Sequence, residues 1–444
     1  MNNSRGKISI KAIIYIIIVM LIVFIGVMIY SKYNFNAYVK GVREGGKTSF
    51  TRDSEIKYSD TDSYKIENTD FNDSMFYKTI EVVPNTPYKI TCMVKTENVE
   101  NRENKYTGGA QIVINNTTEC SKALSGTNDW TELTFMFNSN NRTEVEIGFR
   151  LGGYEEYSKG IAWFSDFKIE EGTIDADNNW NMACFIIQNL DVNVDNRNIR
   201  LSMSEEDIST IEDNMERIKD SISEISGNQM SITYDIIQID EPLTSLSYDE
   251  ENEYYVGPED VQNLIDMYVN QEEYDYIYVA VRLGDLSQSN ELLVHDWIGL
   301  GAMEYNQIGF SNIRLPDNQN SRIYEYSTFH TFPEEVFVHE FLHTLERNEL
   351  ENGNDIARLH DYAIYGYEES PVSGLKDWYS AYMQNNIEGY ENKGLTEFAY
   401  NSKPIHESNF KYGIELDYLD EPDNILEELN SIINRFSEMF GKKE

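Results

Sequence analysis

Two histidines four residues apart, His339 and His343, have the type and spacing that most directly indicate chemistry in this chain. Side chains four residues apart lie on the same face of an α-helix, so both imidazoles can bind one metal ion. Glu340 follows the first histidine and can reach a water molecule on that metal. In the His-Glu-x-x-His arrangement a helix supplies two zinc ligands and the glutamate acts as general base. The segment therefore predicts a zinc hydrolase with Glu340 as its catalytic residue.

The residues around this motif predict a helix with one apolar face. Thr331 and Glu334 have capping-box spacing, and Pro333 would lie in the first turn, where a missing N–H costs least. The apolar face would consist of Val336, Phe337, Phe341, Leu342 and Leu345. Since no charged residue stands between Glu340 and His343, the ligands can be buried. The alternative is a core helix that carries two hydrogen-bonded histidines.

Catalytic zinc normally has three protein ligands, so one more must come from outside the motif. The helix is expected to end near Asn352-Gly353, a typical C-terminal signal, after which the chain reverses. His360 lies beyond the reversal and is the predicted third ligand. Asp361 is the alternative, either as the third ligand or as an acceptor that orients an imidazole. The remaining candidates are Glu346, Glu349, Glu368 and Glu369.

A tetrahedral oxyanion formed during hydrolysis needs a hydrogen-bond donor near the metal. Tyr362, Tyr365 and Tyr367 follow His360 closely, and Tyr365 is the predicted donor. Ordinary packing is the alternative for these side chains, because the chain contains 31 tyrosines.

Charge and N-terminal composition restrict the partners and the location. With 36 basic and 77 acidic residues the net charge is −41, which argues against nucleic acid or anionic lipid as a partner. Residues 12–30 form an uncharged run of 19 residues that is long enough to span a bilayer at ~1.5 Å per residue. Lys and Arg precede it, and no small-residue cleavage site follows. We expect a cytoplasmic tail at 1–11, an uncleaved signal anchor at 12–30, a linker at 31–46 and extracellular domains; a cleaved signal peptide is the alternative.

Residues 47–172 are predicted to form an all-β sandwich. Strand-like runs separated by short turns fit this fold, and they are Phe76–Val83, Tyr88–Lys95, Ala110–Asn115, Thr131–Asn138, Val145–Leu151 and Ile161–Ile169. The phrases Val83–Tyr88, Asn128–Leu133 and Ala162–Phe167 resemble those of carbohydrate-binding modules with a jelly-roll fold. That resemblance implies a glycan as a partner, a core position for Trp130 and Trp163, and a structural Ca²⁺ in the loops. Cys92 and Cys120 could form a disulfide, or Cys120 could be a small buried residue.

Residues 173–444 are predicted to form one α+β domain. A buried strand at 181–190 precedes an amphipathic helix capped at Ser204, and further strands are expected at 231–239 and 274–282, with a short helix near 258–268 between them. Residues 299–313 have the pattern of an irregular extended segment. This order resembles the upper subdomain of zincin peptidases, whose edge strand pairs with the substrate backbone. Glu346 and Glu349 stand where the metzincin branch would have Gly and His. The resemblance therefore does not extend to the metzincin motif beyond His343.

The combined prediction is a membrane-anchored extracellular zinc metallopeptidase that cleaves proteins or glycoproteins. The alternative is a non-enzymatic, glycan-binding surface adhesin with a structural zincin-like domain. Peptide deformylases also use His-Glu-x-x-His, but they act in the cytoplasm with a Cys ligand. The anchor and the distant position of Cys184 argue against that class.

Overall fold

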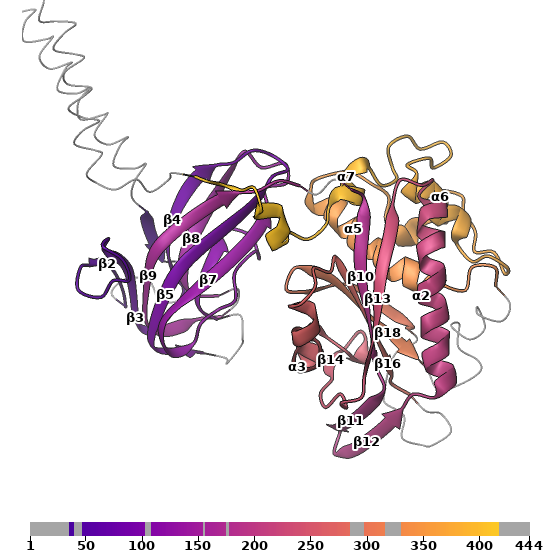
Figure 1. Cartoon of the computed structure of the whole chain (residues 1–444), viewed down its shortest axis with the longest axis horizontal. Coiled ribbons are helices and arrows are strands. Elements are labelled where there is room, and N and C mark those ends of the chain that lie inside the picture. Colours follow the sequence, from indigo (N-terminus) through magenta and orange to yellow (C-terminus); the bar gives the residue numbers. More distant parts are fainter. Residues whose placement is uncertain are drawn as a thin grey trace, which may run out of the picture. The chain divides into compact units, whose positions relative to one another are not determined.

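A computed structural model describes residues 35–39, 47–102, 108–153, 156–174, 177–284, 297–315 and 330–416. The chain divides into two compact units, residues 1–174 with 407–444 and residues 175–406 (Figure 1). The predicted anchor at 12–30 lies outside the described residues. Within the described ranges, no helix has both the length and the apolar composition needed to cross a bilayer.

The first unit is a sandwich of two antiparallel sheets, as the sequence predicts. One sheet has the order β1-β4-β8-β6, and the other has the order β2-β3-β9-β5-β7, with β19 pairing with β9. The strands are β1 Asn36–Val39, β2 Thr48–Asp53, β3 Ser63–Asn72, β4 Ser74–Glu81, β5 Pro87–Asn101, β6 Gly109–Ile114, β7 Gly126–Asn138, β8 Glu144–Gly152, β9 Ser158–Glu171 and β19 Ile414–Glu415. Alternate side chains of the two sheets meet in one apolar core.

Three sequence expectations for the sandwich are tested by its side chains. Trp163 is buried as expected, and its indole N–H donates to Asp53 at 2.9 Å. The core position predicted for Trp130 is wrong, because its half-buried ring lies edge-on to the exposed Tyr58. Cys92 is buried and Cys120 is exposed, and both are free thiols, so neither the disulfide nor a buried Cys120 is present.

The C-terminal boundary of the second domain differs from the prediction of 173–444. Described residues 407–416 return to the sandwich, where Ile414 pairs with Glu171 and the Leu416 N–H donates to the Ile169 carbonyl at 2.9 Å. The short 3₁₀ helix η2, Glu407–Phe410, precedes this strand. Such a long-range return carries no local sequence signal.

The second unit is built on a mixed sheet with the order β13-β10-β16-β18-β17. Its first four strands are parallel, and only β17 is antiparallel to its neighbour. The strands of this unit are β10 Asn179–Ile187, β11 Asn189–Val194, β12 Arg197–Ser202, β13 Ser231–Ile239, β14 Ser247–Asp249, β15 Glu253–Tyr255, β16 Tyr276–Arg282, β17 Gly299–Tyr305 and β18 Ile308–Leu315. The segment predicted as irregular at 299–313 is therefore a hairpin of two strands.

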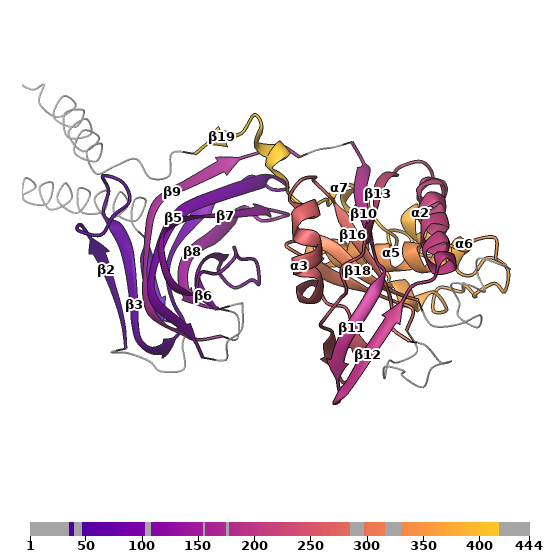
Figure 2. The same cartoon turned by 60° about the horizontal axis from the view of Figure 1, so that its bottom comes forward.

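Helices cover both faces of this sheet, which is why its central strands are apolar on both sides. The helices are α2 Glu205–Ile225, α3 Pro258–Val269, α5 Glu335–Glu351, α6 Lys376–Met383 and α7 Glu397–Asn401. Figure 2 shows α2 and α5 on one face and α3 on the other. Cys184 of β10 packs in the core on the α2 and α5 side, whereas its neighbour Phe185 packs on the α3 side. The predicted capping box at Ser204 is present.

The helix that carries the histidine motif begins differently from the prediction. Its N-cap is Glu334, without a side-chain cap, so the predicted Thr331 capping box does not form. The Thr331 hydroxyl and N–H both donate to the Val372 carbonyl, and the Glu334 carboxylate accepts a hydrogen bond from Ser221. The side chains of Thr331 and Glu334, which were predicted to cap the helix, therefore form tertiary hydrogen bonds instead. The predicted end is confirmed: Asn352 is the C-cap, and Gly353 has a φ of 85°.

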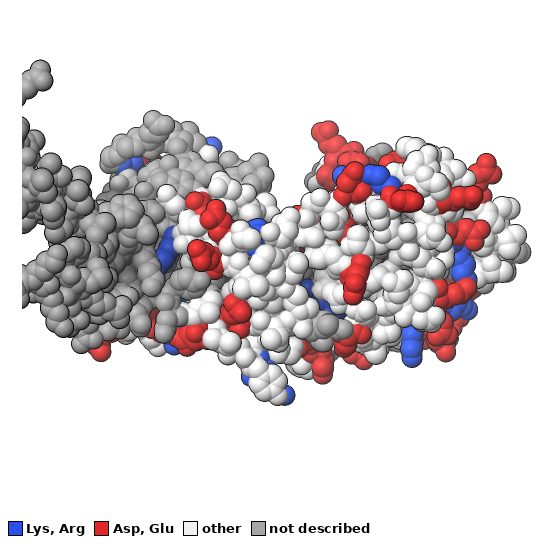
Figure 3. All heavy atoms as spheres, turned by 90° about the horizontal axis from the view of Figure 1, so that it is seen from above, with Lys and Arg blue, Asp and Glu red and all other residues white. Residues whose placement is uncertain are grey.

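The described surface carries the acidic character of the sequence. In the view of Figure 3, acidic side chains outnumber basic ones over the described atoms. Many of the basic side chains are engaged in ion pairs, such as Arg282 with Asp207 at 2.6 Å and Arg347 with Glu304 at 3.0 Å. Little positive charge is therefore left to attract a polyanion.

Candidate metal centre

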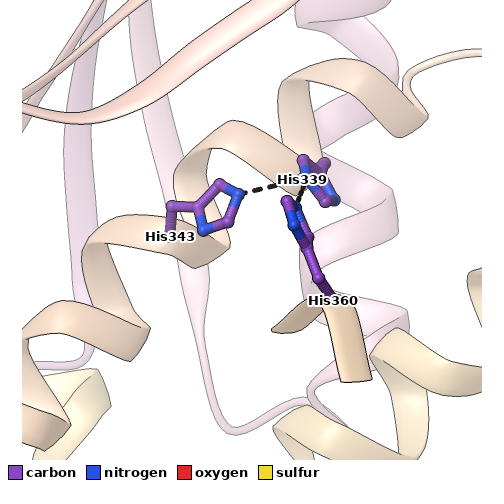
Figure 4. Close-up of side chains that lie close together, drawn as sticks. All are labelled: His339, His343 and His360. Atoms are coloured by element: carbon purple, nitrogen blue, oxygen red, sulfur yellow. Dashed lines mark hydrogen bonds between the residues drawn. The ribbon is translucent and has the colours of Figure 1, made fainter. Parts of the chain in front are cut away.

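Three imidazoles converge at the surface of the second unit (Figure 4). His339 and His343 project from adjacent turns of α5, and His360 comes from the 3₁₀ helix η1, Leu359–Asp361. The Nε2 atom of His339 lies 3.1 Å from that of His343 and 3.0 Å from that of His360. A tetrahedral zinc ion with Zn–N bonds of about 2.1 Å places its nitrogen ligands about 3.4 Å apart. The three side chains therefore fit zinc with small adjustments.

The His360 turn is held in place through the backbone of its neighbour Leu359. The Leu359 N–H donates to Glu346 Oε1 at 2.9 Å, and its carbonyl accepts the Trp378 indole N–H at 2.9 Å. Because Glu346 belongs to α5 and Trp378 to α6, two helices fix the position of the turn. The chain reversal at Gly353 is what brings His360 back beside the helix, as the sequence predicts.

Each helix histidine has a partner for the ring nitrogen that faces away from the other imidazoles. His343 Nδ1 lies 3.2 Å from Glu346 Oε2, and His339 Nδ1 lies 2.9 Å from the Tyr379 hydroxyl. In the tautomer whose Nδ1–H donates to Glu346, the Nε2 lone pair of His343 is free for a metal. Burial opposes ionisation of Glu346, but the hydrogen bonds from His343 and Leu359 outweigh it and lower the pKa of this carboxyl.

The environment of His360 also favours metal binding. Burial and the nearby His343 lower the pKa of His360, although the charges of Glu346 and Asp361 oppose this shift. A lowered pKa keeps the imidazole neutral, and the neutral ring is the form that binds metal. His360 is the most exposed of the three histidines, so the site is open to solvent on this side.

Glu340 is buried beside this cluster. Burial raises the pKa of its carboxyl to about 7, against the opposing effects of His343 and of a hydrogen bond from the Gly301 N–H. A general base is most effective when its pKa lies near the operating pH. A carboxyl with a pKa near 7 is suited to accept a proton at neutral pH.

The other sequence candidates lie in different surroundings. Asp361 is on η1 outside the converging imidazole nitrogens, and the Nδ1 partners of the helix histidines are Tyr379 and Glu346. The Tyr365 ring is stacked on Trp378 with centroids 5.7 Å apart, in an aromatic cluster. Glu349 is buried and accepts a hydrogen bond from the Thr396 N–H, so it joins α5 to the start of α7. Glu368 and Glu369 are exposed.

Two residues contact the helix histidines in ways that the sequence does not predict. Glu346, a candidate third ligand, instead contacts His343 Nδ1, and its position three residues after His343 places it within reach of that ring on a helix. Tyr379 is 40 residues from His339, so no spacing could indicate their contact.

We expect Tyr379→Phe to weaken zinc binding by about tenfold to a hundredfold, because outer partners of ligating histidines contribute to this extent. Competition with a chromophoric chelator measures the change in the zinc Kd. Tyr382→Phe is the matched control: its hydroxyl lies on the same helix but donates to the Ala357 carbonyl at 3.0 Å. An unchanged zinc Kd for Tyr379→Phe would contradict an orienting role.

Comparisons with known proteins find partial likenesses to solved structures. No protein-family model matches this sequence, and no curated protein matches it. Solved structures similar to part of the chain include a protein titled "CBM4 structure and function" (16% identity, TM-score 0.21), over 30% of this chain and 86% of that one. Others are the tailspike protein 4 domain of bacteriophage CBA120 (12%, 0.23) and the CBM22-1–GH10 modules of Clostridium thermocellum xylanase 10B (13%, 0.20).

These likenesses cover about a third of the chain: 31% for the tailspike and 36% for the xylanase. They span 19% and 32% of those two proteins. The neighbours are mainly carbohydrate-binding modules with a β-sandwich. Their identities lie below 25% and their TM-scores below 0.5, so these likenesses carry no conclusion about this chain's site or activity.

Proposed function

We propose that the second unit is a zinc-dependent hydrolase that cleaves peptide bonds in proteins or glycoproteins. The observation that carries the proposal is the convergence of three imidazole Nε2 atoms beside the buried Glu340. A structural zinc site needs no buried carboxylate next to its ligands, whereas a hydrolytic site needs a base there. The zincin-like order of elements, with an antiparallel edge strand before the motif helix, supports the same class.

In this mechanism the residues of the chain would have separate roles. His339, His343 and His360 would hold the metal, and Tyr379 and Glu346 would orient the two helix histidines. A bound zinc ion would supply Lewis acidity that lowers the pKa of water to about 7. Glu340 would accept the proton of the attacking water and return it to the departing amine. Anchoring in the cell membrane through the apolar run at 12–30, with the following domains outside the cell, is part of the proposal.

Metal analysis of the purified full-length chain tests this proposal. We expect one zinc ion per chain, hydrolysis of a fluorogenic peptide library, and loss of that hydrolysis with 1,10-phenanthroline. Added zinc should restore the rate, because the ligands are pre-arranged. Absence of stoichiometric zinc, or hydrolysis that survives metal removal, would contradict the proposed mechanism.

A second candidate is glycan binding by the sandwich, with or without an active second unit. The comparisons provide no support for peptide hydrolysis, and the neighbours include modules solved with β-1,4-galactotriose and cellotriose. In this chain the specific observation is the aromatic pair Tyr58 and Trp130, whose centroids are 5.8 Å apart. Tyr58 is 51% exposed, and the ion pair of Lys95 with Asp129 at 2.8 Å lies next to Trp130. Exposed aromatic rings beside polar groups suit a pyranose ring.

A glycan array probed with the full chain tests this second candidate, and Tyr58→Ala should weaken any signal that it gives. Glycan binding without stoichiometric zinc would favour the adhesin over the peptidase. The calcium expected for the sandwich stays a prediction: among the described residues, only the three histidines gather as a candidate metal cluster.

A further inference from the structure

The edge strand β17 approaches the motif helix through two glycines, Gly299 and Gly301. A Cβ atom added to Gly299 would lie 2.6 Å from Glu340 Cδ, and one added to Gly301 would lie 2.8 Å from Glu340 Oε2. Real Cβ atoms do not approach other heavy atoms so closely. Neither glycine is among the residues with positive φ, so each is needed for space and not for backbone conformation.

The same strand also lies against the Glu340 carboxylate. The Gly301 backbone N–H is close enough to the carboxylate to lower its pKa. A Cβ at Gly301 would also lie 2.7 Å from the Glu340 carbonyl oxygen, so helix and strand are in close contact here. Glu340 is 5% exposed, and its side chain lies against the backbone of Gly299 and Gly301.

Arg347, two turns after Glu340 on α5, holds the next part of β17. Its Nη1 donates to the Ala302 carbonyl at 3.1 Å and to the Met303 carbonyl at 3.4 Å, and its guanidinium pairs with Glu304 at 3.0 Å. The pairing of β17 with β18 shifts register between Leu300 and Met303, and Ala302 has a φ of 59°. Helix α5 therefore contacts strand β17 at two places, through Glu340 and, at the bulge, through Arg347.

We propose that Gly299 and Gly301, here called the glycine pair, position the Glu340 carboxylate for proton transfer, and that Arg347 keeps the pair in place through the bulge. The three are positioning residues, since they act on the reaction through Glu340. This inference rests on the proposed hydrolase function for its kinetic consequence. Its structural consequence, a carboxylate fixed by bare backbone, is independent of that function.

Gly299→Ala is the sharpest test, because the nearest atoms to the new Cβ all belong to the Glu340 side chain. In a crystal structure of the metal-free variant, the carboxylate should have left the Gly301 N–H. The kcat should fall by about tenfold to a hundredfold, as a misplacement of ~1 Å can cost this much. KM and zinc per chain should stay unchanged. Gly284→Ala is the matched control, since a Cβ there meets nothing within 4 Å.

The result that overturns the proposal is a Gly299→Ala structure in which the Glu340 carboxylate keeps its wild-type position beside Gly301. If the wild-type chain hydrolyses no peptide, the proposed function fails, whereas the crystal structures still decide the positioning of Glu340. If Gly299→Ala does not fold, Arg347→Lys provides the same decision. Lysine keeps a positive charge near Glu304 but cannot match the planar fork of arginine. A lower kcat with unchanged zinc content and KM supports the proposal, and wild-type kcat contradicts it.

Discussion

Glu340→Gln should reduce peptide hydrolysis by at least about 10³-fold while one zinc ion per chain remains bound. General acid–base groups contribute 10²–10⁴-fold, and the amide keeps the shape of the side chain but accepts no proton at neutral pH. Because Glu340 has a raised pKa of about 7, its carboxyl can both accept and release a proton near that pH, and the amide loses both steps. Initial rates on a peptide substrate, measured beside zinc content, give the result.

The matched control for this variant is Glu351→Gln, at the exposed end of the same helix. It makes the same chemical change without touching the imidazoles, so its rate should equal that of the wild type. Residual hydrolysis by Glu340→Gln near the wild-type rate would remove Glu340 from the mechanism. Loss of zinc from this variant would instead assign the carboxylate a role in holding the metal site together.

His360→Ala should weaken zinc binding by about 10³-fold or more. Structural zinc sites bind with about 10–16 kcal/mol, so one ligand of three accounts for roughly 4 kcal/mol, which is about a thousandfold in Kd. Since the His360 turn is held through Leu359, the substitution should leave the fold intact. Chelator competition measures the Kd, and circular dichroism checks the fold.

Asp361→Asn is the comparison that decides between the two sequence candidates for the third ligand. Asp361 lies outside the converging nitrogens, so its amide variant should change the zinc Kd by less than about tenfold, through charge alone. If Asp361→Asn weakened zinc binding more than His360→Ala, the Asp361 carboxylate would be the third ligand and His360 would not bind the metal.

The elements that were predictable from the sequence are those whose signals are local. Helix α2 shows its capping box at Ser204 and an apolar stripe over its whole length, and both features are present in the fold. The six strand-like runs predicted for the sandwich correspond to β4–β9, whereas β1, β2, β3 and β19 were not predicted. The spacing of His339 and His343 fixes their common face on any helix.

The features that escaped prediction depend on partners far away in the chain. The β17–β18 hairpin has an irregular sequence pattern because Gly299 and Gly301 leave room for Glu340 of another element, and because the strand pairing has a bulge between Leu300 and Met303. Thr331 has the sequence of a cap, yet Val372 takes its hydrogen bonds. Tyr379 reaches His339 only after α6 has packed on the core. For Thr331, tertiary contacts outweigh a capping preference of about 1 kcal/mol.

The return of residues 407–416 to the sandwich makes the second unit an insertion within the first one. Both of its chain ends, near 175 and 406, join segments that belong to the same β-sandwich. A proteolytic cut near 406 would therefore leave the second unit covalently attached to residues 1–174. After a cut near 175, only the noncovalent contacts of residues 407–416 with the sandwich would hold it, so its release would also require that β19 leave β9.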